Sequence, residues 1–243
     1  MSARTDPSIR DVPSPNCEPR PPGTAIDTLV IHYTGMRNAE EALARLCDPA
    51  ASVSAHYMID EDGTVSRLVP EQMRAWHAGV SSWRGETNIN DRSIGIELVN
   101  PGHEFGYRRF PQAQMESLVR LVKDILARHP IPASRILAHS DVAPLRKRDP
   151  GELFDWAFLA RAGIGLWPER SARAGSGVPL AVAAAQALLA AIGYASSSSG
   201  TMDEETAAAI AAVQRRFRPE RVDGRLDAET AALLRWLAEK SAP

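Results

Sequence analysis

The sequence predicts an α/β protein in which helices flank a mixed central sheet, followed by a small three-helix domain. Three observations predict this fold class. Apolar runs of strand length alternate with helical patterns up to about residue 168, two of those runs form a hairpin pattern, and the composition then changes to alanine-rich helix. A hairpin requires antiparallel neighbours, whereas crossover helices join parallel strands, so the two together indicate a mixed sheet.

Four expected strands and one helix define the first region. The strands are expected at residues 26–33, 54–59, 64–69 and 93–99, and Asp60-Glu61-Asp62-Gly63 reads as the hairpin turn. The helix is expected at residues 112–128, where apolar side chains recur at helical spacing and Pro130 follows. Its expected apolar positions are Met115, Leu118, Val119, Val122, Ile125 and Leu126.

Three amphipathic segments define the second region, at residues 180–192, 203–217 and 227–239. Asp203 and Asp227 are expected as N-terminal caps of the last two. Each aspartate lies between a glycine and a threonine at fixed offsets, in Gly200 to Thr206 and again in Gly224 to Thr230. Units of this size need their neighbours to bury a core, which favours one small three-helix domain.

The domain boundaries follow from composition. We expect a proline-rich, extended arm over the surface at residues 1–24, a catalytic domain at 25–168, a linker at 169–177 and the three-helix domain at 178–243. The arm contains no apolar segment of the kind found in secretory signals, which favours a cytoplasmic location. The periplasm stays open as the alternative, because a start codon assigned too late would hide a signal.

The overall composition excludes several classes of function. With 243 residues and a formal charge of -2, the chain has no basic footprint for nucleic acid. No stretch approaches the roughly 20 apolar residues of a membrane span. The two cysteines, Cys17 and Cys47, have neither the spacing of metal ligands nor the number needed for a disulfide framework.

Three residues suggest a catalytic zinc site. His32 and His139 each end an apolar stretch, and Asp149 follows His139 ten residues later. Two imidazoles and a carboxylate suit Zn²⁺, and three protein ligands leave one coordination position for water. For each histidine alone, a structural role at the end of a strand is the competing interpretation.

Glu97 and Lys147 are the candidate catalytic residues. A carboxylate inside the apolar run at residues 93–99 is costly to bury, and beside an activated water it would serve as a general base. An edge position facing water is the alternative for Glu97. Lys147 precedes Asp149 by two residues, so in an extended chain both point the same way and its ammonium could stabilise an oxyanion. The alternative for Lys147 is a solvated residue in the run at 146–148.

Four further residues are candidates for lining a substrate cleft: His56, Tyr57, Trp76 and His77. They occur as the neighbouring pairs His56-Tyr57 and Trp76-His77. Aromatic residues in strands and loops pack equally often in a core, so both interpretations stay open.

At these residues the chain resembles a family, the zinc-dependent N-acetylmuramoyl-L-alanine amidases of the AmpD and AmiD kind. These are relatives of phage lysozyme-type amidases and of peptidoglycan-recognition proteins. Six short motifs occur in the family's order over about residues 14–168. They are Val30-Ile31-His32-Tyr33-Thr34-Gly35, Ser54-Ala55-His56-Tyr57, Ala75-Trp76-His77-Ala78-Gly79, Ser93-Ile94-Gly95-Ile96-Glu97, Ala138-His139-Ser140-Asp141 and Lys147-Arg148-Asp149-Pro150-Gly151.

The resemblance implies the fold of these amidases and hydrolysis of the bond between N-acetylmuramic acid and L-alanine. It implies His32, His139 and Asp149 as Zn²⁺ ligands, Glu97 as the catalytic carboxylate and Lys147 as the stabilising cation. The implied partners are muropeptides, including anhydro-muropeptides, or intact murein. Residues 178–240 resemble a three-helix peptidoglycan-binding domain.

Two other classes of function compete with this interpretation. A non-catalytic peptidoglycan-recognition protein would share the fold, but it need keep neither the three ligands nor Glu97. A structural adaptor of the cell wall acting through residues 178–243 alone would leave the metal ligands unexplained.

Overall fold

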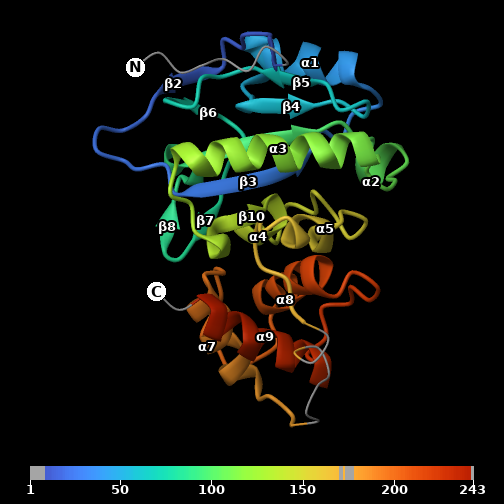
Figure 1. The fold of residues 1–243 in the computed structure, drawn as a ribbon. Coiled ribbons are helices and arrows are strands. Elements are labelled where there is room, and N and C mark those ends of the chain that lie inside the picture. The colour runs from blue at the N-terminus through green and yellow to red at the C-terminus, as the bar shows by residue number, and fades with distance from the viewer. Residues whose placement is uncertain (1–8, 170–171, 173–177, 242–243) are drawn as a thin grey trace. The chain divides into compact units, whose positions relative to one another are not determined.

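The computed structural model describes residues 9–169, 172 and 178–241 (Figure 1). The chain divides into two compact units, the first comprising Met1–Gly79 and Asn90–Pro132 and the second Val80–Ile89 and Ala133–Pro243. Almost all of the expected linker at 169–177 lies outside the described residues. The domain boundaries drawn from composition therefore stay a prediction.

The first unit holds most of the strands. They are β1 (Ile9–Asp11), β2 (Cys17–Pro19), β3 (Thr28–Tyr33), β4 (Tyr57–Ile59), β5 (Val65–Arg67), β6 (Met73–Ala75) and β9 (Ser93–Leu98). Its helices are α1 (Ala39–Cys47), the short 3-10 helix η1 (Pro49–Ala51), α2 (Gly102–Phe105) and α3 (Gln112–Arg128). The 3-10 helix η2 (Ile89–Arg92) begins at Ile89, the last residue of a segment of the second unit, and continues into the first unit at Asn90.

The main sheet is mixed, which confirms the predicted fold class. Its strand order is β1-β5-β4-β9-β3-β10, where β10 comprises Ile136–Ala138. β4 and β5 pair antiparallel around the expected turn, whereas β3, β9 and β4 run parallel. Every residue of β9, and all of β3 except Tyr33, is buried. The two strands that carry His32 and Glu97 therefore lie inside the sheet.

The helix α3 spans the residues predicted for it and lies along the sheet of the first unit (Figure 1). Its buried face differs in detail from the predicted one. Leu121 and Gln114 are buried, whereas Val119 and Leu126 are only partly so. Gln114 is buried because its side-chain amide donates to the backbone carbonyls of Ile59 and Val99, where their strands end.

The described part of the proline-rich segment is not an arm over the surface. β1 adds to the edge of the main sheet beside β5, and β2 pairs with β6. Between them Ser14 and Asn16 are buried, and the Asn16 amide donates to two backbone carbonyls. An extended chain can satisfy the open edge of a sheet, and this edge pairing was not visible in the composition.

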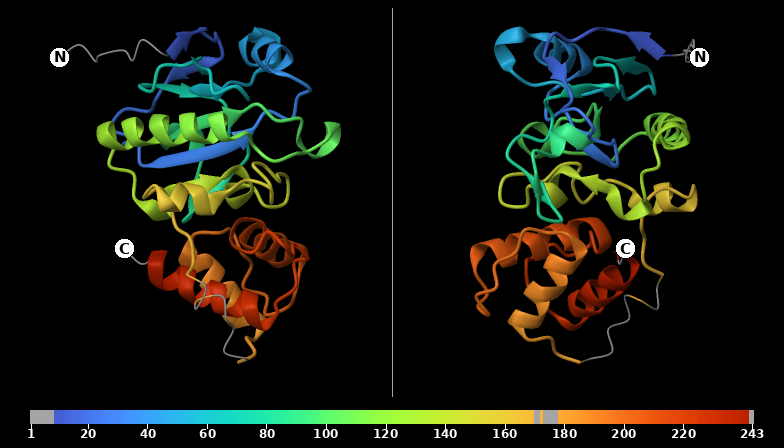
Figure 2. Two further views of the ribbon diagram at one scale, coloured as in Figure 1. Left: turned by 45° about the vertical axis from the view of Figure 1, so that its right-hand side comes forward. Right: turned by 90° about the vertical axis from the view of Figure 1, so that its left-hand side faces the viewer.

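The second unit contains the remaining elements. They are β7 (Ser82–Trp83), β8 (Glu86–Thr87), the 3-10 helix η3 (Ala133–Arg135), β10, α4 (His139–Val142), α5 (Trp156–Arg161), α7 (Val182–Ile192), α8 (Glu204–Phe217) and α9 (Ala228–Ser241). The last three helices pack together and form the predicted three-helix region (Figure 2). Among the described residues, no helix is long and apolar enough to cross a bilayer.

The repeated glycine–aspartate–threonine pattern forms two equivalent helix starts. Asp203 accepts hydrogen bonds from the backbone N–H and the hydroxyl of Thr206 at the start of α8. Asp227 does the same for Thr230 at the start of α9. These bonds satisfy backbone donors that a helix leaves open, as expected for capping residues.

A buried glutamine from the preceding helix completes each of these starts. Gln186 accepts from the backbone of Gly200 and donates to the Thr206 hydroxyl. Gln214 accepts from Gly224 and donates to the Thr230 hydroxyl. The sequence repeat is therefore a structural repeat that joins each helix to the next.

Candidate metal centre

His32 and Glu97 are direct neighbours on one face of the sheet. They are register partners in the parallel pair formed by β3 and β9. Side chains of partnered residues project to the same face, since successive residues alternate across a strand. Both side chains are shielded, with 1% of His32 and 8% of Glu97 exposed. Glu97 is therefore not the water-facing edge residue of the alternative interpretation.

A second histidine holds the ring of His32. The His77 Nδ1 atom lies 3.1 Å from the His32 Nε2 atom, and its Nε2 atom lies 3.1 Å from the Ser93 hydroxyl. The two imidazoles meet edge to face. The Asn90 side chain accepts from the backbone N–H of His77 and fixes the loop that presents it. His77 is thus a supporting partner of the candidate ligand His32.

Gly95 makes room for this arrangement. It lies two residues before Glu97 and hence on the same face, where the His77 ring packs onto it. An added Cβ would lie 2.4 Å from the His77 Cγ atom. Glycine inside a strand often marks such a close approach, and Gly95 in its apolar run was the available sequence signal.

His139 and Asp149 meet in the second unit. β10 ends at Ala138 and α4 begins at His139, so the imidazole sits at the turn between them. The His139 Nδ1 atom lies 2.9 Å from the Asp149 Oδ2 atom. The backbone N–H of Ser140 donates to the Asp149 carbonyl, which ties the two segments together. Both side chains are buried, with 4% and 5% exposed.

His32, His139 and Asp149 form a group that could hold a metal ion. One potential ligand atom from each lies within 4.8 Å of the others, and all three residues are buried. Buried neutral imidazoles and a carboxylate are the donor set that divalent transition metals prefer. The chemistry of the donors therefore fits the ion predicted from the sequence.

A turn leads into Lys147. The N–H groups of Arg146 and Lys147 both donate to the Ala143 carbonyl, at a turn that contains Pro144. Lys147 and Arg148 lie in no helix or strand, and the shared direction of the Lys147 and Asp149 side chains stays a prediction. Lys147 is half-buried, and its role stays a prediction.

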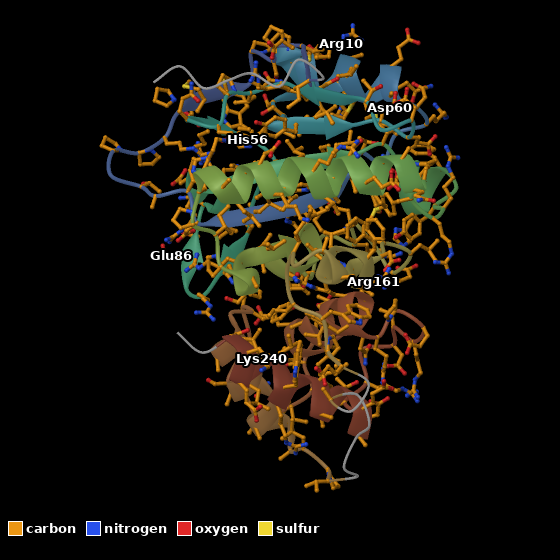
Figure 3. All side chains as sticks on the ribbon, in the orientation of Figure 1. Arg10, His56, Asp60, Glu86, Arg161 and Lys240 are labelled. Carbon is orange, nitrogen blue, oxygen red and sulfur yellow. The ribbon has the colours of Figure 1, made fainter. Side chains whose placement is uncertain are left out.

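His56 is a buried structural partner of β9, which makes it a poor candidate for contact with substrate. It lies just before β4, in the interior of the first unit (Figure 3). Its Nδ1 atom accepts from the Gly95 N–H, and its Nε2 atom lies 3.1 Å from the Met73 carbonyl. Burial, and then the Arg20 guanidinium, lower the pKa of His56 to about 3, which keeps its ring neutral.

Tyr57 lies on the opposite face of the sheet. It is the register partner of Ile96, the neighbour of Glu97, and so points away from the face of His32. Its hydroxyl donates to Glu71, which also binds Arg128 at the end of α3. The structure does not bring Tyr57 to the candidate centre, because alternation along β4 fixes its direction.

Trp76 is half-buried and precedes His77 in the loop after β6. Its indole N–H donates to Glu18 on β2, and its backbone N–H donates to the Ser54 hydroxyl. These bonds hold the loop that presents His77.

Replacing Gly95 by alanine should weaken metal binding and lower the melting temperature. The new methyl group would displace the His77 ring from His32, and such overpacking costs about 1–3 kcal/mol. Zinc content after dialysis and thermal unfolding measure the two effects. In a His77→Ala background the same change should cost much less, because the ring is gone. An equal cost in both backgrounds would show that the His77 contact is irrelevant.

Comparison with known proteins decides the family. The sequence model of the N-acetylmuramoyl-L-alanine amidase family matches residues 22–152, and that of a putative peptidoglycan-binding domain matches residues 180–234. The chain is 41% identical over 233 residues to N-acetylmuramoyl-L-alanine amidase AmiD of Escherichia coli, covering 88% of this chain and 83% of that protein. The chain belongs to the N-acetylmuramoyl-L-alanine amidase family.

Other relatives of this amidase support the same assignment. It is 38% identical over 165 residues to 1,6-anhydro-N-acetylmuramyl-L-alanine amidase AmpD of Enterobacter cloacae, covering 61% of this chain and 86% of that protein. The structure of E. coli AmiD with anhydro-N-acetylmuramic acid-L-Ala-D-γ-Glu-L-Lys matches at a TM-score of 0.80 and 40% identity, covering 91% of this chain and 92% of that one. AmpDh3 of Pseudomonas aeruginosa with an anhydromuramic pentapeptide matches at 0.82 and 35% identity, covering 92% and 95%.

The family resemblance and the fold class predicted from the sequence are therefore confirmed, as is the enzyme class. The residues that support the candidate ligands were not foreseen. Asn90 and Ser93 contact His77 across 13 and 16 positions of the chain, and nothing in the sequence marks either residue as a partner of a histidine.

Proposed function

We propose that His32, His139 and Asp149 hold a zinc ion and that the amidase uses it to cleave N-acetylmuramoyl-L-alanine bonds in muropeptides. The observation that carries the proposal is the buried group of two imidazoles and a carboxylate, whose ligand atoms lie within 4.8 Å of one another. A bound zinc ion would lower the pKa of a water molecule towards ~7 and polarise the amide carbonyl.

The partner of His32 determines which nitrogen is left for the ion. Metal-binding histidines commonly donate their other N–H to a neighbouring group, which fixes the ring. The Nε2 atom of His32 faces the Nδ1 atom of His77 at 3.1 Å. His32 would therefore offer its Nδ1 atom to the ion. The Nε2–H group of His77 would in turn donate a hydrogen bond to the Ser93 hydroxyl.

Glu97 would act as the general base and acid. Its place beside His32 in the register puts a carboxylate next to a ligand residue, on the same face of the sheet. From there it would take a proton from the attacking water and return it to the amine of L-alanine as the amide bond breaks. Lys147 would bring its ammonium to the oxyanion that develops on the carbonyl oxygen.

Relatives point to the form of substrate. AmpD of Enterobacter cloacae is named a 1,6-anhydro-N-acetylmuramyl-L-alanine amidase, and E. coli AmiD and AmpDh3 have structures with anhydromuramic peptides. We therefore propose soluble anhydro-muropeptides as substrates, consistent with recycling of cell-wall fragments. The cytoplasmic location stays a prediction, with the periplasm as its alternative.

A digest of defined muropeptides tests this function. Incubation with N-acetylmuramoyl and 1,6-anhydro-N-acetylmuramoyl peptides should release the intact stem peptide from the sugar in both cases, as resolved by mass spectrometry. We expect faster release from the anhydro compound. Binding without any release would instead indicate a non-catalytic recognition protein, and equal rates would remove the proposed preference.

A further inference from the structure

The Asp141 carboxylate is the most enclosed charged group near the candidate ligands. It is fully buried, with 0% of its surface exposed. Its Oδ2 atom accepts from the Ala138 backbone N–H and from Arg216, at 2.8 and 2.7 Å. Its Oδ1 atom accepts from the Tyr194 hydroxyl at 2.6 Å. Donors from three separate parts of the second unit therefore converge on one side chain.

Asp141 determines how the chain enters α4. The bond from its carboxylate to Ala138 closes the turn at the residue just before His139. The backbone of His139 in turn accepts from Ala143 one helical turn later. The His139 imidazole thus leaves the backbone at a turn that is closed by the Asp141 carboxylate, and its Nδ1 atom meets Asp149.

Arg216 and Tyr194 come from the three-helix region of residues 182–241, which we call the C-terminal module. Arg216 lies on α8, which packs against α4 (Figure 1). It is 4% exposed, and its guanidinium stacks 4.1 Å over the ring of Trp156 on α5. The module therefore supplies a buried cation to the segment that bears His139.

Tyr194 is also held by close contacts within the second unit. It follows α7 and meets the ring of Trp83 edge to face at 4.9 Å. The backbone N–H of Arg84 donates to the carbonyl of Gly193, where an added Cβ would lie 2.7 Å from the Trp83 ring. This is a close and specific contact, unlike that of a domain joined only through a tether.

We propose that Arg216 and Tyr194 of the C-terminal module are positioning residues for the metal ligand His139, acting through Asp141. The inference rests on the proposed zinc site. The module then has two roles, because it completes the support of a ligand in addition to any binding of peptidoglycan.

The physical reason is the cost of an uncompensated charge. A buried carboxylate that loses its cation is left as an uncompensated charge, so it must rehydrate or rotate. Each of these changes weakens the bond from Asp141 to Ala138 and releases the turn before His139. Loss of partners in the layer around metal ligands typically lowers metal affinity or activity about 10- to 100-fold.

Variants of the full-length protein test this proposal. Arg216→Met and the milder Tyr194→Phe are compared with wild type in three measurements: the zinc dissociation constant by competition with a chromogenic chelator, kcat and KM on a small soluble muropeptide, and the melting temperature. We expect Arg216→Met to weaken zinc binding about 10- to 100-fold and to lower kcat with KM unchanged. Tyr194→Phe should act in the same direction but less, and Arg216→Lys should restore part of the affinity.

Arg218→Met is the matched control. Arg218 is also a buried arginine of the module, 1% exposed, but its ion pairs are with Asp223, Asp227 and Glu229 inside the module. This variant should lower the melting temperature and leave zinc affinity near that of wild type. If it weakens zinc binding as much as Arg216→Met does, the effect is general destabilisation and the proposal is wrong.

Asp149→Ala separates this proposal from the zinc site on which it rests. If Asp149→Ala loses zinc while Arg216→Met and Tyr194→Phe bind it normally, the positioning role is refuted and the metal site stands. If Asp149→Ala retains zinc, the proposed ligand set itself fails.

Discussion

Replacing Glu97 by alanine should leave zinc bound and lower turnover by at least ~10²-fold, the usual effect of losing a general base. The reason is that Glu97 neighbours His32 in the sheet but is proposed to handle protons, not to hold the ion. Zinc content measured by mass spectrometry and kcat on a defined muropeptide give the two numbers. Glu97→Gln, which keeps the shape and removes the basicity, should give a loss of similar size.

Glu71→Gln is the matched control for Glu97. Glu71 is also a shielded carboxylate of the first unit, but it contacts Tyr57, which points to the opposite face of the sheet, and Arg128 and His129 at the end of α3. This variant should lose stability and keep kcat. If zinc content falls in Glu97→Ala as far as it does in Asp149→Ala, Glu97 is a ligand or a folding residue instead of the base.

Removing the metal should abolish hydrolysis, and adding zinc back should restore it. Only three protein groups are proposed to hold the ion, so a strong chelator can compete for it, and Glu97 alone would have to deprotonate a water molecule of ordinary pKa. Asp149→Ala should reproduce the loss permanently, because two imidazoles alone bind zinc weakly. Activity is measured after chelation, after zinc is returned and after magnesium is added as a control. Full activity in a preparation shown to contain no metal would contradict the mechanism.

The sequence predicted the elements of this fold well where the signal is local. The position of α3 followed from apolar side chains at helical spacing that end before Pro130, and the hairpin of β4 and β5 followed from its turn residues. His139 and Asp149 are only ten residues apart, and a short turn region could be expected to bring them together. Family motifs supplied the remaining candidates.

Predictions failed where the outcome depends on pairing between distant segments. The edge pairing of β1 with β5 is a property of the assembled sheet, so composition suggested a surface arm instead. The direction of Tyr57 depends on its register against β9, which cannot be read from a three-residue strand. The contact of Asp141 with Arg216 joins residues 75 positions apart and has no local signature.

The buried ion pair of Asp141 and Arg216 also limits how this protein could be rebuilt by recombination. Here a transplanted module would need a cation and a hydroxyl at the same two points, since an unpartnered buried carboxylate costs about 3–5 kcal/mol. A chimera that exchanges the module should therefore also exchange residue 141, and selection would favour inheriting the two halves together.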